Sequence, residues 1–325
     1  MAVDAPWMTR WVEVPESCDG MRVDRFLARR FPDWSRTTLV AGIKRGQVCS
    51  EDGNPLRPSA RLRSNAVLGV TIPGLAPESG PPEFPPILHE DAHLIVVNKP
   101  AGLLCHPAGS NHVWALISLA KLRWPEDRID LVHRLDRDTS GCIVLTKTLE
   151  ANQFLKAAFK AGEANKTYTA ICRGEIPWDS TRLTGPIGSD GGVVRIKMAV
   201  REDGLAARTD VTVLERANGL TRVSCALHTG RTHQIRVHLD HAGFPLLGDR
   251  LYGVPPEIFL HSLDHGQDAT VRAASGAPYH ALHAERLELP HPDGSRLNFV
   301  APVPATLERW WIHPEHLPHD SESTP

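Results

Sequence analysis

A proline-rich break constrains the fold of this chain more than any other feature of its sequence. Residues 73–86 read PGLAPESGPPEFPP, and such a stretch holds neither a helix nor a central strand. We therefore predict a linker at 74–86 that separates a small domain at 12–73 from a larger domain at 87–310. An N-terminal tail at 1–11 and a mobile C-terminal tail at 311–325 complete the predicted organisation.

Composition limits the class of protein. With 325 residues, 41% of them hydrophobic, the chain can build one domain of about 200 residues and a smaller one. Its net charge of −2 means that local basic patches would have to hold any polyanionic partner. The six cysteines include no C-x-x-C pair and are typical of reduced core residues in a cytosolic protein. Without a signal peptide or a membrane-length apolar run, we expect a cytoplasmic protein that has no membrane partner.

The small domain combines two predicted helices with an excess of positive charge. Apolar spacing predicts a helix at 22–31, and Ser35 and Gly46 are typical first and last signals of a second helix. Two acids, Asp24 and Asp33, offset seven cations on these helices, which leaves +5. The cations form a candidate phosphate-binding face: Arg22, Arg25, Arg29, Arg30, Arg36, Lys44 and Arg45. A solvated helix surface without a ligand explains the charge alone equally well.

The larger domain alternates strand and helix patterns irregularly. Strands are predicted at 92–97, 142–145 and 166–172, and alternation at 223–227 indicates a half-buried strand. Helical spacing covers 149–160, where Thr148 can serve as the N-cap, and a further helix is predicted from a Thr232 cap to about Gly243. Few long helices stand among many strands, which favours an α+β fold over a regular β-α-β series.

Three polar turns follow strands in this domain, at 98–102, at 131–141 and around Arg231. In the second turn Asp136 lies between Arg134 and Arg137, directly before an apolar strand. A surface turn with a local ion pair explains that pattern by itself. Turns held by a rigid sheet are nevertheless where sites are usually built, so we expect the three turns to converge.

The ordered strings of the larger domain resemble a known enzyme family. NKPAGLLCHP (98–107), HRLDRDTSG (133–141), KTYTA (166–170) and GRTHQIRVHL (230–239) are followed by FPLLGD (244–249). They resemble the motifs of RNA pseudouridine synthases of the ribosomal-large-subunit type, over roughly 87–300. The N-terminal region resembles a small RNA-binding module first described in a ribosomal protein, although CSEDG at 49–53 and Ser64-Asn65 depart from its usual pattern.

The resemblance implies a central mixed, mainly antiparallel bent sheet flanked by helices, with a small α/β RNA-binding domain before it. The implied activity is isomerisation of specific uridines in structured RNA, either large-subunit ribosomal RNA or transfer RNA. Asp136 would be the catalytic acid, and Arg231 would be the cation that keeps it ionised. Arg134 would fill the space left by the flipped nucleotide, and Tyr168 would stack on its base.

The implied reaction needs no cofactor and no metal, because uridine is isomerised without gain or loss of atoms or electrons. The carboxylate acts either as a nucleophile on the sugar or as a base that gives a glycal, and the sequence leaves both routes open. No protein partner is implied.

The sequence also allows other interpretations. A non-catalytic RNA-binding or ribosome-assembly protein could share the scaffold. A glycoside hydrolase would need a second acid, for which Asp138 is available. The histidine pairs 238/241, 261/265 and 280/283 have metal-like spacing but lack cysteine partners and an H-E-x-x-H string, which disfavours zinc.

Overall fold

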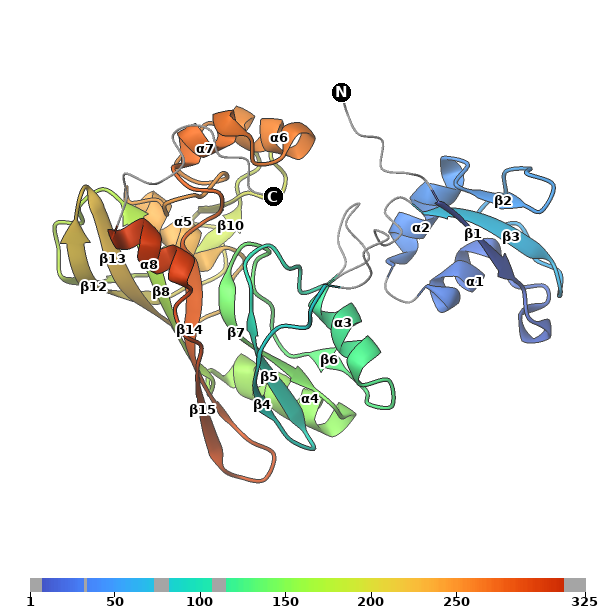
Figure 1. Ribbon diagram of the computed structural model, residues 1–325, viewed down its shortest axis with the longest axis horizontal. Helices are drawn as coiled ribbons and strands as arrows, with labels where there is room; N and C mark the ends of the chain where they lie inside the picture. Colours follow the sequence, from blue (N-terminus) through green and yellow to red (C-terminus); the bar gives the residue numbers. More distant parts are fainter. Residues whose placement is uncertain (1–7, 32–33, 73–81, 107–114, 313–325) are drawn as a thin grey trace. The chain divides into compact units, whose positions relative to one another are not determined.

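The computed structural model describes residues 8–31, 34–72, 82–106 and 115–312. They form two compact units (Figure 1). One comprises the described parts of 1–84 and 104–124, and the other those of 85–103 and 125–325. Most of the predicted linker and most of both predicted tails lie outside the described residues.

The first unit contains short helices and a three-stranded antiparallel sheet in the order β1-β3-β2. Its elements are β1 (Met8–Glu13), η1 (Glu16–Cys18), α1 (Val23–Arg30), α2 (Arg36–Lys44), β2 (Val48–Ser50), β3 (Val67–Ile72) and α3 (Leu116–Arg123). The two predicted helices are confirmed as α1 and α2. Ser35 is the N-cap of α2, since its hydroxyl accepts a hydrogen bond from the Thr38 N–H. Phe26 and Leu27 of α1 and Ile43 of α2 are buried in one apolar core.

The second unit is built on a ten-stranded mixed sheet. Its main path runs β4-β5-β7-β14-β8-β13-β12-β9, with β15 on β14 and β6 on β7. Only the β7 and β14 pair is parallel among the described strand pairs. These strands are β4 (Ile87–Glu90), β5 (Leu94–Lys99), β6 (Asp130–Leu131), β7 (Ser140–Thr146), β8 (Asn165–Arg173), β9 (Ser180–Leu183), β12 (Thr209–Ala217), β13 (Leu220–Leu227), β14 (Leu282–Pro290) and β15 (Arg296–Val300). The predicted α+β class with a mainly antiparallel sheet is confirmed.

Helices and a small hairpin surround this sheet (Figure 1). They are α4 (Leu149–Ala161), the hairpin of β10 (Ile187–Ser189) and β11 (Met198–Val200), α5 (Gln234–His241), α6 (Pro256–His265), α7 (Ala269–Ser275) and α8 (Ala305–Ile312). The hydroxyl of Thr148 caps α4, as predicted. Leu155 of α4 is fully buried in the core that Val96 of β5 and Val144 of β7 share.

The parallel pairing of β7 with β14 depends on a glycine. Gly141 has a φ of +111° and lies opposite Ala284, whose backbone a Cβ at position 141 would strike. Any other residue would therefore push β7 away from β14. Because β7 begins at Ser140, Gly141 also fixes where the preceding turn ends and hence where Asp136 lies.

The prediction that Thr232 caps the next helix is wrong. Helix α5 begins at Gln234, after His233 in a left-handed conformation with φ of +57°. The Gln234 side-chain oxygen accepts hydrogen bonds from the Arg231 N–H at 3.0 Å and the Thr229 hydroxyl at 2.7 Å. A side chain inside the helix thus closes this turn, in place of a hydroxyl before it.

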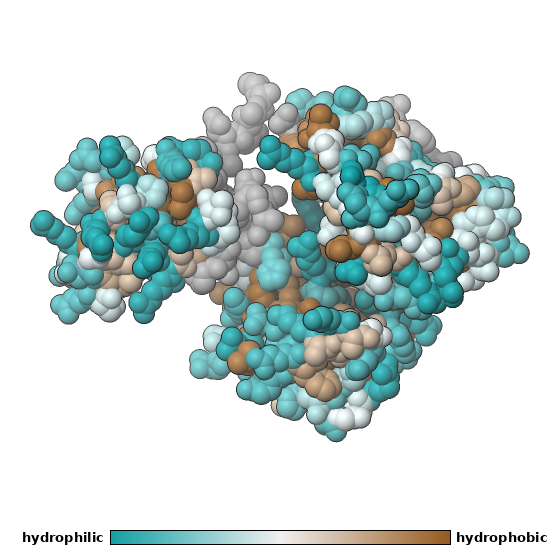
Figure 2. Space-filling model, turned by 180° about the vertical axis from the view of Figure 1, so that it is seen from behind, coloured by the Kyte–Doolittle hydropathy of each residue, from teal (hydrophilic) through white to brown (hydrophobic). Residues whose placement is uncertain are grey.

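The face in Figure 2 is largely hydrophilic, with apolar side chains scattered over it, which is ordinary for a folded protein. No helix within the described ranges is both long and apolar enough to span a bilayer.

Candidate active site

The predicted convergence of polar turns is borne out around Asp136. Lys99, at the end of β5, is fully buried, and its ammonium donates to the carbonyls of Pro100, Leu103 and Arg137 at 2.8–2.9 Å. The Gly102 N–H also donates to the Arg137 carbonyl at 2.9 Å. The first turn therefore holds the backbone of the second turn directly beside Asp136.

The cation paired with Asp136 is Arg236, whereas the resemblance pointed to Arg231. Nη1 of Arg236 donates to Oδ2 of Asp136 at 2.8 Å. Arg231 instead donates from Nε to the Ala206 carbonyl at 3.0 Å. Arg231 lies in the turn before α5, whereas Arg236 lies in the first turn of α5 itself. Because of this difference in position, Arg236 reaches Asp136 and Arg231 does not.

A second carboxylate fixes the Arg236 guanidinium. Asp249 is fully buried and binds it twice, at 2.7 Å to Nε and 2.8 Å to Nη2. Asp249 also accepts the backbone N–H groups of Leu251 and Tyr252, and the Tyr252 ring lies 4.9 Å from the guanidinium carbon. Since such a bidentate pair fixes orientation as well as charge, Arg236 presents its remaining nitrogen to Asp136.

Asp136 is held in its ionised form. Burial raises the pKa of Asp136, but the groups around the carboxylate, Arg236 first among them, together outweigh burial, so this pKa lies below its usual value. Burial lowers the pKa values of both nearby imidazoles, His233 and His280, to about 4. Both are therefore neutral at pH 7, which leaves Arg236 as the charged neighbour, among the described residues, that stabilises the carboxylate.

Neutral His233 faces Asp136 with its second ring nitrogen. Its Nδ1 lies 2.9 Å from the Tyr252 hydroxyl, whose oxygen accepts the Met198 N–H at 3.0 Å. This network assigns the proton of Tyr252 to Nδ1 and the ring proton to Nε2. Nε2 lies 3.9 Å from Oδ2 of Asp136, so the N–H dipole supports the carboxylate without adding charge.

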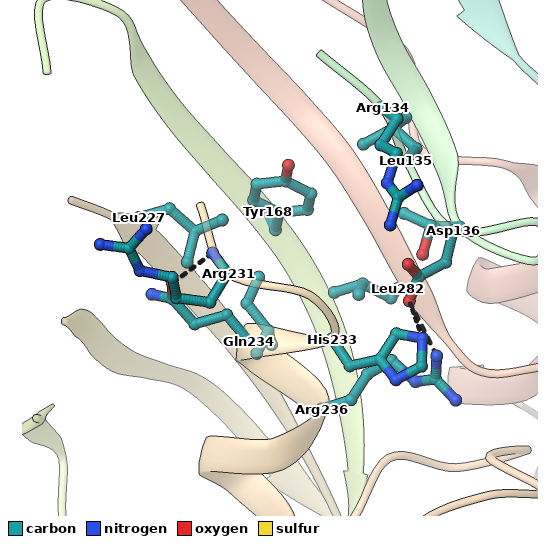
Figure 3. A pocket seen from close by; sticks show the side chains of 12 residues that line it. Arg134, Leu135, Asp136, Tyr168, Leu227, Arg231, His233, Gln234, Arg236 and Leu282 are labelled. Atoms are coloured by element: carbon teal, nitrogen blue, oxygen red, sulfur yellow. Dashed lines mark hydrogen bonds and ion pairs between the residues drawn. The ribbon is translucent and has the colours of Figure 1, made fainter. Parts of the chain in front are cut away.

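An open cavity of about 760 Å³ lies beside Asp136, a volume typical of small-molecule pockets. Its lining brings together all four predicted site residues: Arg134, Asp136, Tyr168 and Arg231. In Figure 3 the Tyr168 ring stands on the wall between Asp136 and Arg231, and Arg134 lies above Asp136. Leu227 and Leu282 add apolar surface to a smaller recess that Asp136 and Tyr168 also line.

Two cations of the predicted basic face share one buried acid. Asp24, at 2% side-chain exposure, binds both Arg22 at 2.9 Å and Arg36 at 2.8 Å. These two arginines therefore stabilise the fold of the unit, while their side chains stay 40% and 58% exposed. RNA binding by the face stays a prediction, and its other cations are Arg25, Arg29, Arg30, Lys44 and Arg45.

The residues considered for other chemistries have structural partners. His280 bonds the Thr139 hydroxyl at 2.7 Å, and His283 bonds the Ser140 hydroxyl at 2.8 Å. Within the described ranges, no group of three or more histidine, cysteine or acidic side chains could hold a metal ion. Asp138 lies 3.5 Å from Arg250 and 3.9 Å from Arg137.

Sequence reasoning missed Lys99, Arg236, Asp249 and Tyr252 as individual site residues. Three of them stood inside quoted strings, NKPAGLLCHP, GRTHQIRVHL and FPLLGD, so a signal was present. Nothing in those strings distinguished a side chain that points into the site from one that packs elsewhere.

Comparisons with known proteins agree with this architecture. Residues 93–241 match the family described as RNA pseudouridylate synthase. The chain is 38% identical over 307 residues to ribosomal large subunit pseudouridine synthase D of Xanthomonas campestris, which covers 92% of this chain and 91% of that protein. It is also 38% identical over 310 residues to the protein of that name in Pseudomonas aeruginosa, covering 91% and 92%.

Two solved structures are similar as well. Human RNA Pseudouridylate Synthase Domain Containing 1 gives a TM-score of 0.54 at 25% identity, covering 67% of this chain and 82% of that one. Domain Containing 4 gives 0.53 at 28%, covering 71% and 92%. The fold, together with these relatives, defines the class of this protein as an RNA-modifying isomerase. The chain belongs to the RNA pseudouridine synthases, which confirms the resemblance.

Proposed function

We propose that this chain converts specific uridines of large-subunit ribosomal RNA to pseudouridine, with Asp136 as the catalytic residue. One observation carries the proposal. Oδ2 of Asp136 is held by Arg236, whereas Oδ1 accepts no hydrogen bond from any side chain or backbone group of the described residues. The Asp136 side chain is 28% exposed and lines the cavity that Tyr168 also lines. An ionised oxygen therefore faces space where a substrate can lie.

The reaction requires this carboxylate oxygen to be ionised. The bond from ribose C1′ to the base nitrogen N1 breaks, the base turns and C5 joins C1′. The proton on C5 then leaves and N1 takes up a proton, so that the composition is unchanged. Asp136 either attacks C1′ as a nucleophile or removes a sugar proton to give a glycal. Both routes require the carboxylate form, which Arg236 stabilises.

The cavity also suits a nucleotide that has left its stack. Flipping a base out of folded RNA costs a few kcal/mol, and stacking on an aromatic ring returns roughly 1–3 kcal/mol. Tyr168 supplies that ring, Leu227 and Leu282 supply apolar contacts, and exposed Arg134 can occupy the vacated position in the RNA. Arg231, on the far side of Tyr168, can contact the RNA backbone.

The choice of ribosomal RNA follows the names of the relatives, which are ribosomal large subunit pseudouridine synthases over most of this chain. Transfer RNA is the second substrate class that the sequence allowed. The cations of the first unit (Arg25, Arg29, Arg30, Lys44 and Arg45) offer phosphate contacts to either RNA.

Chemical mapping of pseudouridines tests the proposal in cells. A strain without this protein should lose pseudouridine at defined large-subunit positions, and the unsubstituted gene should restore them. Asp136→Asn should not restore them, although the protein accumulates normally. Loss of pseudouridine only from transfer RNA would move the substrate. A strain that loses no pseudouridine but assembles ribosomes poorly would favour a non-catalytic binding protein instead.

A further inference from the structure

A second cavity, of about 150 Å³, adjoins Asp136. It shares Asp136 and His233 with the first cavity, but neither Tyr168 nor Arg231 lines it. Its other walls include Arg137, Asp138, Ile196, Arg250, Phe259 and His280. The Asp136 carboxylate therefore stands between an aromatic cavity and a cavity that contains additional arginines.

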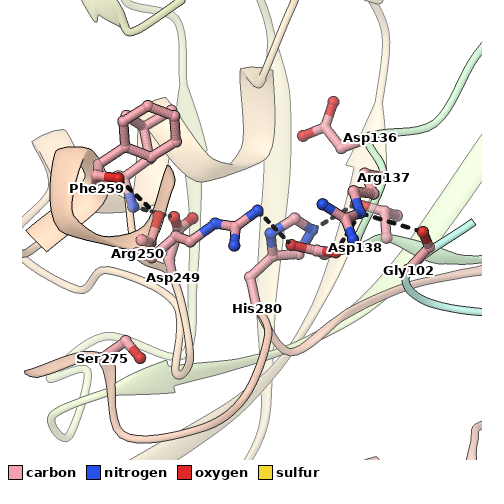
Figure 4. A network of polar contacts seen from close by, with 12 residues as sticks. Gly102, Asp136, Arg137, Asp138, Asp249, Arg250, Phe259, Ser275 and His280 are labelled. Atoms are coloured by element: carbon pink, nitrogen blue, oxygen red, sulfur yellow. Dashed lines mark hydrogen bonds and ion pairs between the residues drawn. The ribbon is translucent and has the colours of Figure 1, made fainter. Parts of the chain in front are cut away.

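The arginines of the second cavity are short of negative charge. Arg250 lies 3.5 Å from Asp138, and Arg137 lies 3.9 Å from the same carboxylate (Figure 4). Both distances exceed those of ordinary hydrogen bonds. Arg137 also donates from Nε to the Gly102 carbonyl at 3.2 Å. One carboxylate thus serves two guanidinium groups, each of which keeps donors for another acceptor.

The other charges nearby do not make up this deficit. Arg236 already binds two carboxylates, Asp136 and Asp249. His280 is neutral at pH 7, because burial lowers its pKa to about 4. The Arg250 side chain is 20% exposed. Burial lowers the pKa of Arg250, because the nearby carboxylates do not make up for the hydration that its guanidinium loses. A partly buried guanidinium with one loose partner is a binding site for an anion.

The substrate itself places an anion there. A uridine whose C1′ meets Asp136 and whose base stacks on Tyr168 must direct its sugar and phosphates away from Tyr168. Building on the proposed function, we propose that Arg250 and Arg137 bind the phosphodiester adjoining the target uridine in this second cavity. Ile196, which is 55% exposed, and Phe259 then pack against the ribose beside that phosphate.

A neutral phosphate analogue tests the contact. The full chain is assayed on a synthetic RNA stem-loop that carries a uridine mapped as a product site. One methylphosphonate replaces each of the two linkages adjoining that uridine in turn. For the unsubstituted chain, we expect one of the two replacements to raise KM about tenfold, the effect typical of removing a charge-assisted hydrogen bond, with a much smaller change in kcat.

The variants separate the contact from general effects. Arg250→Gln should raise KM on ordinary RNA and show no further rise with the methylphosphonate, while Arg250→Lys should recover part of the binding. Arg137→Gln should behave like a milder Arg250→Gln. Arg182→Gln serves as the control, because Arg182 is 58% exposed and paired with Asp210 on β12, and it should match the unsubstituted chain. Thermal melting confirms that each variant is folded.

A methylphosphonate penalty of the same size in Arg250→Gln and in the unsubstituted chain would overturn the phosphate contact. So would the absence of any penalty at either linkage. Failure of the proposed function looks different, since the unsubstituted chain would then form no pseudouridine in the all-phosphate RNA. That result would remove the phosphate proposal as well.

Discussion

The two units contain ion-pair clusters with opposite arrangements. In the first unit one buried carboxylate, Asp24, serves two exposed arginines, Arg22 and Arg36. In the second unit one buried arginine, Arg236, serves two carboxylates, Asp249 and Asp136. The acid of the first cluster is enclosed, whereas one acid of the second is 28% exposed to a cavity.

The two clusters differ in whether a substrate can reach one of their charged groups. The arginines around Asp24 hold an acid that cannot meet a substrate, so that cluster stabilises the fold. Asp249 holds Arg236, and Arg236 in turn leaves an oxygen of Asp136 open. The number of charges is the same, but only the second arrangement ends in an accessible ionised group.

Removal of Arg236 should have the largest effect on this contrast. Arg236→Met leaves Asp249 buried without its counter-ion, which should cost about 3–5 kcal/mol of stability. The pKa of Asp136 should rise, because burial then acts unopposed. The active ionised form exists above that pKa, so activity should be lost at a higher pH as the pH falls. The pH profile of kcat/KM checks this, with Arg236→Lys as a charge-retaining control. An unmoved acid limb would show that Arg236 does not tune Asp136.

Loss of the aromatic ring at Tyr168 should have the next largest effect. Tyr168→Leu should lower kcat/KM, because the bound base loses one stacking contact worth roughly 1–3 kcal/mol. Tyr168→Phe keeps the ring and should retain most of kcat/KM. Steady-state kinetics on one RNA substrate compares the two. Equal losses in both variants would assign the role to the hydroxyl instead of the ring.

A substitution at Asp24 should affect stability without affecting chemistry. Asp24→Asn leaves Arg22 and Arg36 without their shared acid, and each kcal/mol of lost stability lowers the melting temperature of a unit this small by roughly 4–8 °C. The value of kcat at saturating RNA should not change. A fall in kcat in protein that melts normally would show that the first unit takes part in the reaction step.

The smallest expected effect concerns the remaining cations of the first unit. Arg29→Gln combined with Arg30→Gln should weaken RNA binding and flatten its salt dependence. The log–log slope should fall by roughly 0.7–0.9 for each phosphate that the variant no longer neutralises. Filter binding at several salt concentrations measures that slope. If the slope were unchanged, RNA binding would belong to the second unit alone.

Local signals in the sequence predicted a large part of this molecule. The caps formed by Ser35 and Thr148 could be predicted, because each capping hydroxyl bonds a backbone N–H only three residues further along the chain. The alternation around 223–227 correctly indicated a strand. The turn that bears Asp136 was recognised for a similar reason, since its charges and glycine lie in one short string.

The rest depended on contacts between distant segments. Arg231 and Arg236 differ by five positions in one string, and only the true start of α5 decides which of them reaches Asp136. Asp249 is 113 positions beyond Asp136 in the sequence, so spacing could not join them. The seven cations of the first unit were counted as equal, although Asp24 captures two of them through the fold.

We propose above that the exposed oxygen of Asp136 performs the reaction. The most direct measurement is tritium release from carbon-5-labelled uridine RNA by Asp136→Asn, compared with Asp138→Asn two residues away. We predict no release by Asp136→Asn at any enzyme concentration and continued release by Asp138→Asn, with both proteins folded. Release by Asp136→Asn at the normal rate would show that Asp136 does not perform the reaction.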